Sequence, residues 1–166
     1  MKNIWGLSIE IIEELGNDLV SFYDQFKQFF QTRTRDVSHH GLTWFKASLL
    51  MEGKRTYMEV SRKIVDPLDD GQNIQHFMSD SPWESRPIFD EIQGQIGAQF
   101  PSRGSMLNID ESGDECSSTG KAGAQKQYIG RLGKTEVGQV GVVSSWYGEG
   151  VWALTDAELF FPESWF

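Results

Sequence analysis

An acidic residue that directly follows a short apolar run is the first feature of this sequence that could do chemistry. Residues 106–109 predict a strand, and Asp110 stands directly behind it. A carboxylate at the end of a strand is held rigidly and can still face a cleft, which suits a Mg²⁺ ligand. An Asp that initiates a turn gives the same pattern, so spacing alone leaves both interpretations open. Nearby Glu111, Asp114 and Glu115 lack the spacing of a calcium loop and are expected on a loop surface.

A second pattern is a run of basic side chains without intervening acids, in residues 121–134. Its basic members are Lys121, Lys126, Arg131 and Lys134. A glycine-punctuated loop can approach a DNA backbone closely, and Lys or Arg would then contact phosphate. The candidate DNA contacts are Gln127, Tyr128, Arg131 and Lys134. Tyr128 could stack on a base. The alternative is a structural loop that braces the first two strands, with Tyr128 packed against the sheet.

Two expected helices, residues 56–65 and 71–78, resemble a helix-turn-helix pair joined by a short acidic connector. Amides bond well to adenine edges, so the polar face of the second helix could read bases. The candidate contacts on that face are Gln72 and His76. The alternative is a helix that docks through its apolar side and leaves a solvated polar face. The acids of the connector weaken the DNA interpretation locally.

The formal net charge of −9 argues against DNA binding through overall charge. Nonspecific binding relies on Lys and Arg replacing counterions along the phosphates, so any DNA contact must come from local basic patches. Residues 46–63 and 121–134 are the two basic segments. Charge alone places neither of them above an ordinary solvated surface.

Bulk composition excludes several classes of protein. A chain of 166 residues fits one domain, or a small domain with part of a second. Hydrophobic residues make up 39% and aromatic residues 13%, enough for a core, which excludes disorder. No apolar run approaches the ~20 residues of a membrane span, and the N-terminus lacks the features of a signal peptide. The single Cys116 cannot form an intramolecular disulfide. We expect a cytoplasmic protein without a membrane partner.

The first hundred residues read as helices. An apolar stripe over residues 4–29 has helical spacing, and residues 16–18 are expected to end one helix and cap the next. Further helices are expected over residues 42–51, 56–65 and 71–78. The sequence Ser-Pro-Trp-Glu at residues 81–84 is a helix-start signal, although Pro87 could kink that helix or delay its start.

The character of the sequence changes after residue 100, where short β-branched runs begin. Strands are expected over residues 106–109, 139–146 and 151–154, with a turn at 147–150 and a long loop over 111–138. Such a meander would have no covering helix on either face. An open edge and an apolar face would then favour self-association.

One segment near the middle of the chain is NIDESGDECSSTGKAGAQKQYIGRLGKTEVGQVGV. It looks like the first-aspartate region of insertion-sequence transposases with an RNase H-like DDE nuclease domain. The closing LFFPESWF is similar to the family's Leu-Tyr-Leu-Pro-x-x-Trp, and IQHFMSDSPWE to its His-Phe-Leu-Ser-x-Ser-Pro-Trp. Motifs over residues 74–166 therefore agree in order and spacing, whereas residues 1–70 match only in helical character.

The resemblance implies metal-dependent phosphoryl transfer on DNA, with three carboxylates around two divalent ions. Only the first position can be carried over, and it is Asp110, as catalytic residue and metal ligand. The family's second aspartate and its glutamate would lie beyond Phe166. We expect Mg²⁺ or Mn²⁺ in the complete enzyme, no tight metal binding by this chain, and DNA at the element ends as partner.

The expected fold is therefore α+β. Residues 1–100 form a helical region with a DNA-binding role, and residues 101–166 form the first antiparallel strands of an incomplete RNase H-like domain, truncated after the third strand. The leading interpretation is a transposase fragment without its second and third catalytic carboxylates. A second is a stand-alone regulatory protein that binds element ends or the full-length transposase without catalysis. A third is an inactive gene remnant.

Overall fold

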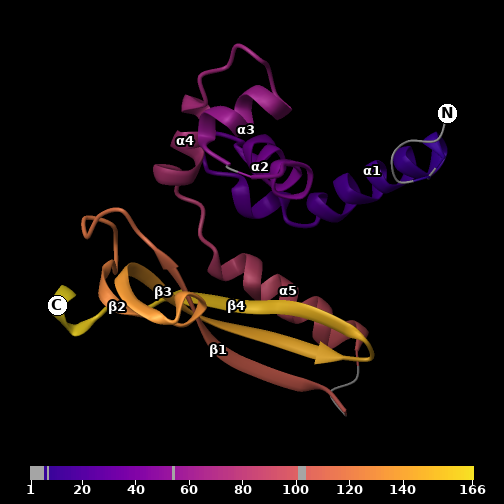
Figure 1. Cartoon of the computed structure of the whole chain (residues 1–166). Coiled ribbons are helices and arrows are strands. Elements are labelled where there is room, and N and C mark those ends of the chain that lie inside the picture. The colour runs from indigo at the N-terminus through magenta and orange to yellow at the C-terminus, as the bar shows by residue number, and fades with distance from the viewer. Residues whose placement is uncertain (1–5, 7, 54, 101–103) are drawn as a thin grey trace. The chain divides into compact units, whose positions relative to one another are not determined.

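The structure, a computed structural model, describes residues 6, 8–53, 55–100 and 104–166. They form two compact units, of which unit 1 ends at Ile88 and unit 2 begins at Phe89. Unit 1 is helical, and unit 2 combines a helix with an antiparallel sheet (Figure 1). The predicted α+β class, with helices first and strands afterwards, is confirmed.

Unit 1 is helical from its first described element to its last. In chain order its elements before residue 80 are α1 (Ile9–Asp24), η1 (Lys27–Phe30), α2 (Ser38–Leu50), α3 (Tyr57–Ile64) and α4 (Gln72–Ser79). The predicted break at residues 16–18 is wrong, because α1 runs through Gly16. A glycine inside a helix costs only about 0.5–1 kcal/mol relative to Ala. The Ser8 hydroxyl caps the start of α1 by accepting the Ile11 N–H at 3.4 Å.

The core of unit 1 is aromatic. Tyr23 of α1 stacks with Phe30 and Phe45, at ring-centroid distances of 5.9 and 6.1 Å. Its hydroxyl donates to the Ser38 carbonyl at 2.5 Å, and burial raises the pKa of this phenol well above its usual range. Phe77 of α4 joins the cluster through Phe30, at 5.7 Å. Rings from α1, η1, α2 and α4 therefore share one core.

Gly71 fixes the junction between α3 and α4. Its φ of +78° lies in the left-handed region, which favours glycine. A Cβ at this position would lie 2.5 Å from the Met58 backbone nitrogen and 2.6 Å from the Tyr57 carbonyl carbon. The start of α4 therefore packs directly against the start of α3, where a capping box between Thr56 and Glu59 begins the helix.

The predicted helix start at residues 81–84 is wrong. These residues are not helical, and α5 (Arg86–Gln99) begins after them, with Pro87 in its first turn. The physical reason is Trp83. Its indole N–H donates to the Phe77 carbonyl at 2.9 Å, and its ring stacks on Phe77 at 5.6 Å. The chain is tied back to α4 here, and the helix starts late, as Pro87 allowed.

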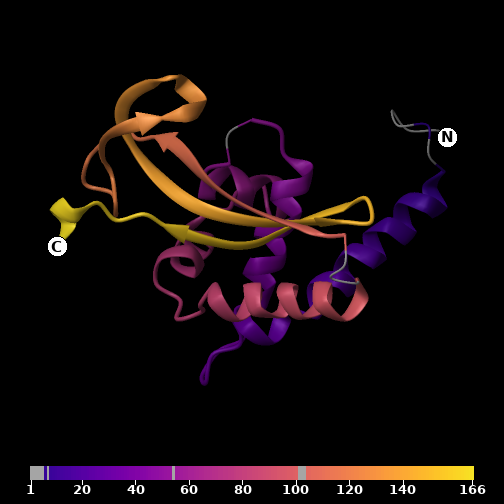
Figure 2. The ribbon, with the colours of Figure 1, turned by 90° about the horizontal axis from the view of Figure 1, so that it is seen from below.

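Unit 2 contains an antiparallel sheet built around one long strand. The strands are β1 (Met106–Glu115), β2 (Gln125–Ile129), β3 (Lys134–Gly148) and β4 (Val151–Leu159). β1 pairs along one edge of β3. Both β2 and β4 pair along the other edge, β2 near the start of β3 and β4 near its end. Figure 2 shows the curvature of β3 and the short hairpin at its start. The 3₁₀ helix η2 (Gly130–Leu132) precedes β3, and the 3₁₀ helix η3 (Glu163–Trp165) follows β4.

The long loop predicted for residues 111–138 is wrong. β1 continues to Glu115 because β3 offers it partners as far as Gly138. Gly113 suits a crowded position in β1, since a Cβ there would lie 3.3 Å from side-chain atoms of Ile129 and Val140. β2, with the polar sequence QKQYI, adds a strand that was not expected. The sheet therefore has four strands where three were predicted, and β4 extends to Leu159.

Residues Glu149 and Gly150 form the turn between β3 and β4, within the predicted segment 147–150. Their φ angles are +50° and +80°. Positive φ at both central residues is what a type I′ hairpin turn requires. Glycine at the second position satisfies this without steric cost, so the turn prediction is confirmed.

α5 covers one face of the sheet, so the expectation that neither face would be covered is wrong. Phe100, directly after α5, packs on Trp146 of β3 at a ring-centroid distance of 5.2 Å. The Gln93 side-chain amide donates to the Thr155 carbonyl of β4 at 2.9 Å. Leu107 of β1 lines the pocket that α5 and the sheet enclose. The helix stripe assigned to the helical region by sequence thus packs on the strands.

Candidate active-site face and DNA-contact surfaces

Asp110 lies within β1, not at the end of a strand as predicted, so the interpretation of Asp110 as a turn-initiating residue is wrong. Its side chain is exposed, and its Oδ1 accepts the Glu111 N–H at 2.8 Å. Successive side chains of a strand alternate between faces. Leu107 points under α5, so Asp110, three positions later, lies on the face of the sheet that α5 leaves open.

The open face of the sheet carries large apolar side chains as well as Asp110. Cross-strand partners share a face, and the register pairs Asp110 with Val143 of β3 and Val143 with Ala157 of β4. The large apolar residues of the same face are Met106, Tyr147, Trp152, Leu154 and Leu159, each at least 37% exposed. The expected uncovered apolar surface is thus present on this face, while self-association stays a prediction.

The residues around Asp110 do not form a metal site by themselves. Within the described ranges of the chain, no three His, Cys, Asp or Glu side chains gather as a metal ion would need. Glu111, the adjacent carboxylate, lies on the other face of β1 because of strand alternation. One carboxylate cannot organise two divalent ions. The ions that the resemblance implies therefore do not fit this set of residues alone.

The four candidate DNA contacts of the basic segment come together on the β2–β3 hairpin, residues 125–138. Gln127 and Tyr128 belong to β2, Arg131 to η2, and Lys134 begins β3. Tyr128 is 59% exposed, so the alternative that packs it against the sheet is wrong. The Gln127 side-chain amide donates to the Gly138 carbonyl at 2.6 Å and is engaged within the sheet. Phosphate contact by these residues stays a prediction.

Two of the cations on the hairpin, Arg131 and Lys134, have carboxylate partners that were not predicted from the sequence. Arg131 Nη2 lies 2.7 Å from Asp114 Oδ1 of β1, and Lys134 Nζ lies 3.0 Å from Glu136 Oε1. The Lys134 hydrogen bond and charge, with a further contribution from Lys126, hold the pKa of Glu136 below its usual range. The two-residue spacing of Lys134 and Glu136 in a strand could have revealed one pair. Arg131 and Asp114 are brought together only by the fold.

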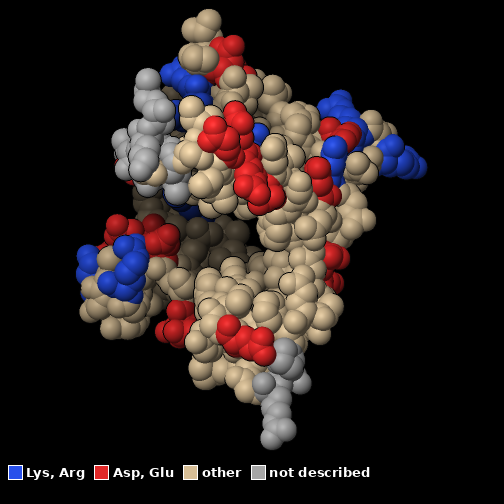
Figure 3. Space-filling view, turned by 90° about the vertical axis from the view of Figure 1, so that its right-hand side faces the viewer, with Lys and Arg blue, Asp and Glu red and all other residues tan. Residues whose placement is uncertain are grey.

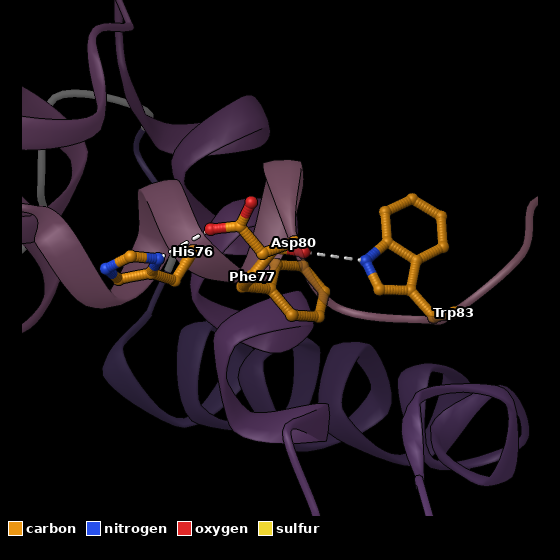
Figure 4. A network of polar contacts seen from close by, with 4 residues as sticks. All are labelled: His76, Phe77, Asp80 and Trp83. Atoms are coloured by element: carbon orange, nitrogen blue, oxygen red, sulfur yellow. Dashed lines mark hydrogen bonds and ion pairs between the residues drawn. The ribbon is translucent and has the colours of Figure 1, made fainter.

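Gln72 and His76 lie one turn apart on the exposed side of α4. Ile74 and Phe77 are 1% and 3% exposed, so α4 docks through its apolar side. His76 Nδ1 lies 2.6 Å from Asp80 Oδ2, and the dashed line between the two side chains in Figure 4 marks this contact. One candidate base contact is therefore paired with an acid, and base recognition by this face stays a prediction.

The connector between α3 and α4, residues 65–71, is longer than the 3–4-residue turn of a helix-turn-helix motif. The carboxylates of Asp66, Asp69 and Asp70 each accept the backbone N–H two residues further on, at 2.7, 2.7 and 3.0 Å. Such contacts are Asx-turns. The three acids therefore shape the backbone of this connector. Hydrogen bonds from the Ser61 hydroxyl and the Gly71 N–H lower the pKa of Asp69.

Acidic and basic side chains adjoin one another on the surface. On the face of the molecule drawn in Figure 3, the groups of Lys and Arg side chains lie beside Asp or Glu side chains. The formal net charge of −9 means that overall charge does not favour DNA contact by this chain.

Comparison with known proteins defines the class. The family described as DDE superfamily endonuclease matches residues 21–166, which is most of the chain, so the chain belongs to that family. It is similar to a "Probable transposase for insertion sequence element IS701" from Microchaete diplosiphon, at 32% identity over 124 residues. The resemblance to insertion-sequence transposases of the DDE superfamily is therefore confirmed. No solved structure matches this one.

The extent of these matches differs between the two chains. The match to the Microchaete diplosiphon relative covers 74% of this chain but 32% of the relative. The chain thus spans about one third of the length of that relative. Among the described residues, no helix is both long and apolar enough to cross a membrane.

Proposed function

We propose that this chain acts in DNA transposition as the portion of an insertion-sequence transposase that carries the first catalytic carboxylate, Asp110. The observation that supports this most directly is the position of Asp110 in a chain of the DDE superfamily. A strand paired along β3 holds the carboxylate rigidly, on the sheet face that α5 leaves open. Rigid placement of this kind is what a reacting group requires. The proposal assigns the other carboxylates, and Mg²⁺ or Mn²⁺, to the complete enzyme.

We expect the chain alone neither to nick nor to join DNA, because one carboxylate cannot organise two metal ions. The measurement is conversion of supercoiled plasmid to nicked or linear forms in the presence of Mg²⁺ or Mn²⁺. Asp110→Asn removes the proposed catalytic group. Glu111→Gln is the matched control, since it removes the neighbouring carboxylate on the opposite face of β1.

Two outcomes of this assay would contradict parts of the proposal. Cleavage by the parent that is lost in Asp110→Asn and kept in Glu111→Gln would show that the chain is catalytically sufficient. Cleavage that persists in Asp110→Asn would remove Asp110 from the chemistry. DNA binding without cleavage by any variant agrees with the proposal, and is also what a regulatory DNA-binding protein would show.

The proposal includes DNA contact through two surfaces, the β2–β3 hairpin and the exposed side of α4. Tyr128, Arg131 and Lys134 offer an aromatic ring and two cations on one hairpin, a combination that suits phosphate and base stacking. Gln72 and His76 offer hydrogen-bonding groups on the exposed side of α4. Because phosphate contacts position a protein and base contacts specify the sequence, we assign affinity to the hairpin and sequence preference to α4.

Replacing Arg131 and Lys134 together with Ala should weaken binding to any DNA duplex and flatten its salt dependence. Each lost phosphate contact reduces the slope of log K against log salt concentration by about 0.9. Replacing Gln72 or His76 with Ala should instead change the preference among sequences. Fluorescence anisotropy over a KCl series measures both quantities. Equal affinity of the hairpin double variant and the parent at low salt would eliminate the hairpin as a phosphate contact.

A further inference from the structure

We propose that the carboxylates of Asp114 and Glu136 compete with DNA phosphate for the cations of the β2–β3 hairpin. This inference rests on the proposed DNA contact of the hairpin and adds a means by which the protein sets its strength. The competitors are the two carboxylates that already occupy the cations. Arg131 is held by Asp114 at 2.7 Å and Lys134 by Glu136 at 3.0 Å.

Each carboxylate occupies the position on its cation that a phosphate oxygen would take. A carboxylate and a phosphate present similar oxygen acceptors to guanidinium and ammonium groups. Each side chain in the two pairs is between 45% and 83% exposed, so water and a DNA backbone can reach the pair. Exposed ion pairs are weak. A phosphate can therefore displace either carboxylate without unfolding the hairpin.

The charge of the hairpin shows how much the carboxylates matter. Three cations lie on it, namely Lys126, Arg131 and Lys134. Glu136 interacts with two of these cations, since Lys134 and, to a smaller extent, Lys126 lower its pKa. Asp114 comes from β1, a separate strand, and is brought to Arg131 by the pairing of β1 with β3. Without the two carboxylates, the hairpin would present three unneutralised positive charges.

Displacement changes the salt dependence as well as the affinity. The displaced carboxylate takes up cations from solution while the DNA phosphate releases its own. This uptake reduces the net ion release that normally drives DNA binding. The parent should therefore bind DNA weakly and with a shallower salt slope than its number of cations suggests.

The test compares two double variants with equal formal charge. Asp114→Asn with Glu136→Gln frees the hairpin cations, whereas Asp90→Asn with Glu111→Gln removes two acids elsewhere in unit 2. Both change the formal net charge from −9 to −7 (−9 plus 2). The probe is a fluorescently labelled DNA duplex of mixed sequence, measured by anisotropy over a KCl series. Circular dichroism confirms that each variant keeps the fold of the parent.

The variant with Asp114→Asn and Glu136→Gln should bind DNA more tightly than the charge-matched control at low salt. The gain should reach up to about five-fold for each carboxylate, the largest effect expected of an exposed pair. Its salt slope should also be steeper, by less than about 0.9 for each carboxylate, because no displaced carboxylate takes up a cation from solution. Tighter binding by this variant also supports the inference if the parent shows no binding.

Two results would overturn the inference, and they separate it from the proposed function. If the parent binds DNA and the two double variants have equal affinity and slope, the carboxylates do not compete, while the DNA contact stands. If neither the parent nor any variant binds the duplex at low salt, the proposed DNA contact of the hairpin fails together with its competitors.

Discussion

Replacing Gly71 with Ala is expected to destabilise unit 1 by roughly 2–5 kcal/mol. A residue with a Cβ in the left-handed region costs about 1–2 kcal/mol, and overpacking adds about 1–3 kcal/mol. The overpacking is severe here because the new Cβ would lie 2.5 Å from a backbone atom of Met58, which cannot turn aside as a flexible side chain would. Denaturant unfolding followed by tryptophan fluorescence and circular dichroism measures the loss.

Gly53→Ala is the matched control for this substitution. Gly53 has a φ of +81°, close to that of Gly71, but a Cβ there would meet nothing within 4 Å. Its replacement should cost only the left-handed conformation, about 1–2 kcal/mol. Equal losses for the two variants would show that the contact between the starts of α3 and α4 does not hold this part of unit 1 together.

Ile129→Ala is expected to destabilise unit 2 by about 2–5 kcal/mol, the usual range for removing a buried branched side chain. Ile129 is 0% exposed. Its side chain lies over Gly113 of β1 and Gly138 of β3, where any Cβ would come within 3.3 and 2.5 Å of it. Both strands lose contacts when it is shortened, and their backbone leaves little room to fill the cavity.

Hydrogen exchange of the β2 and β3 amides measures this effect in unit 2 alone. Thr135→Ala serves as the control, because Thr135 is exposed in the same hairpin and its change should stay within about 1 kcal/mol. Loss of protection in Ile129→Ala no greater than in Thr135→Ala would contradict the central role of Ile129 in this sheet.

The helices were largely predictable from sequence because periodicity is a local property. α2, α3 and α4 lie within a few residues of their predicted ranges. Predictions failed where a distant contact decides the structure. The late start of α5 depends on Trp83 and Phe77, and β2 forms from a polar segment because β3 pairs with it. The docking of α5 on the sheet could not be inferred from its apolar stripe, which would fit a helical partner equally well.

The candidate site shows the same division. Asp110 was identified through a resemblance, which specifies the residue but not its surroundings. Its place on the open face became evident only with the register of β1 against β3. The partner of Arg131 lies seventeen positions away in Asp114, and no local pattern indicates such a pair. The sequence therefore proposed candidate side chains, whereas the fold determined which residues lie next to them.

The acids along β1 bear on how copies of this chain meet in concentrated solution. In the described part of the chain, no strand pairs with the outer edge of β1, which leaves its backbone groups free to template another copy. Asp110, Glu111, Asp114 and Glu115 line this strand. Two copies joined edge to edge would crowd eight carboxylates into one ribbon, twice the four of one copy. Repulsion between these carboxylates would disfavour edge-to-edge pairing through β1 and leave the apolar face as the surface for self-association. The repulsion is stronger in dilute buffer than in concentrated salt, because salt screens exposed charges.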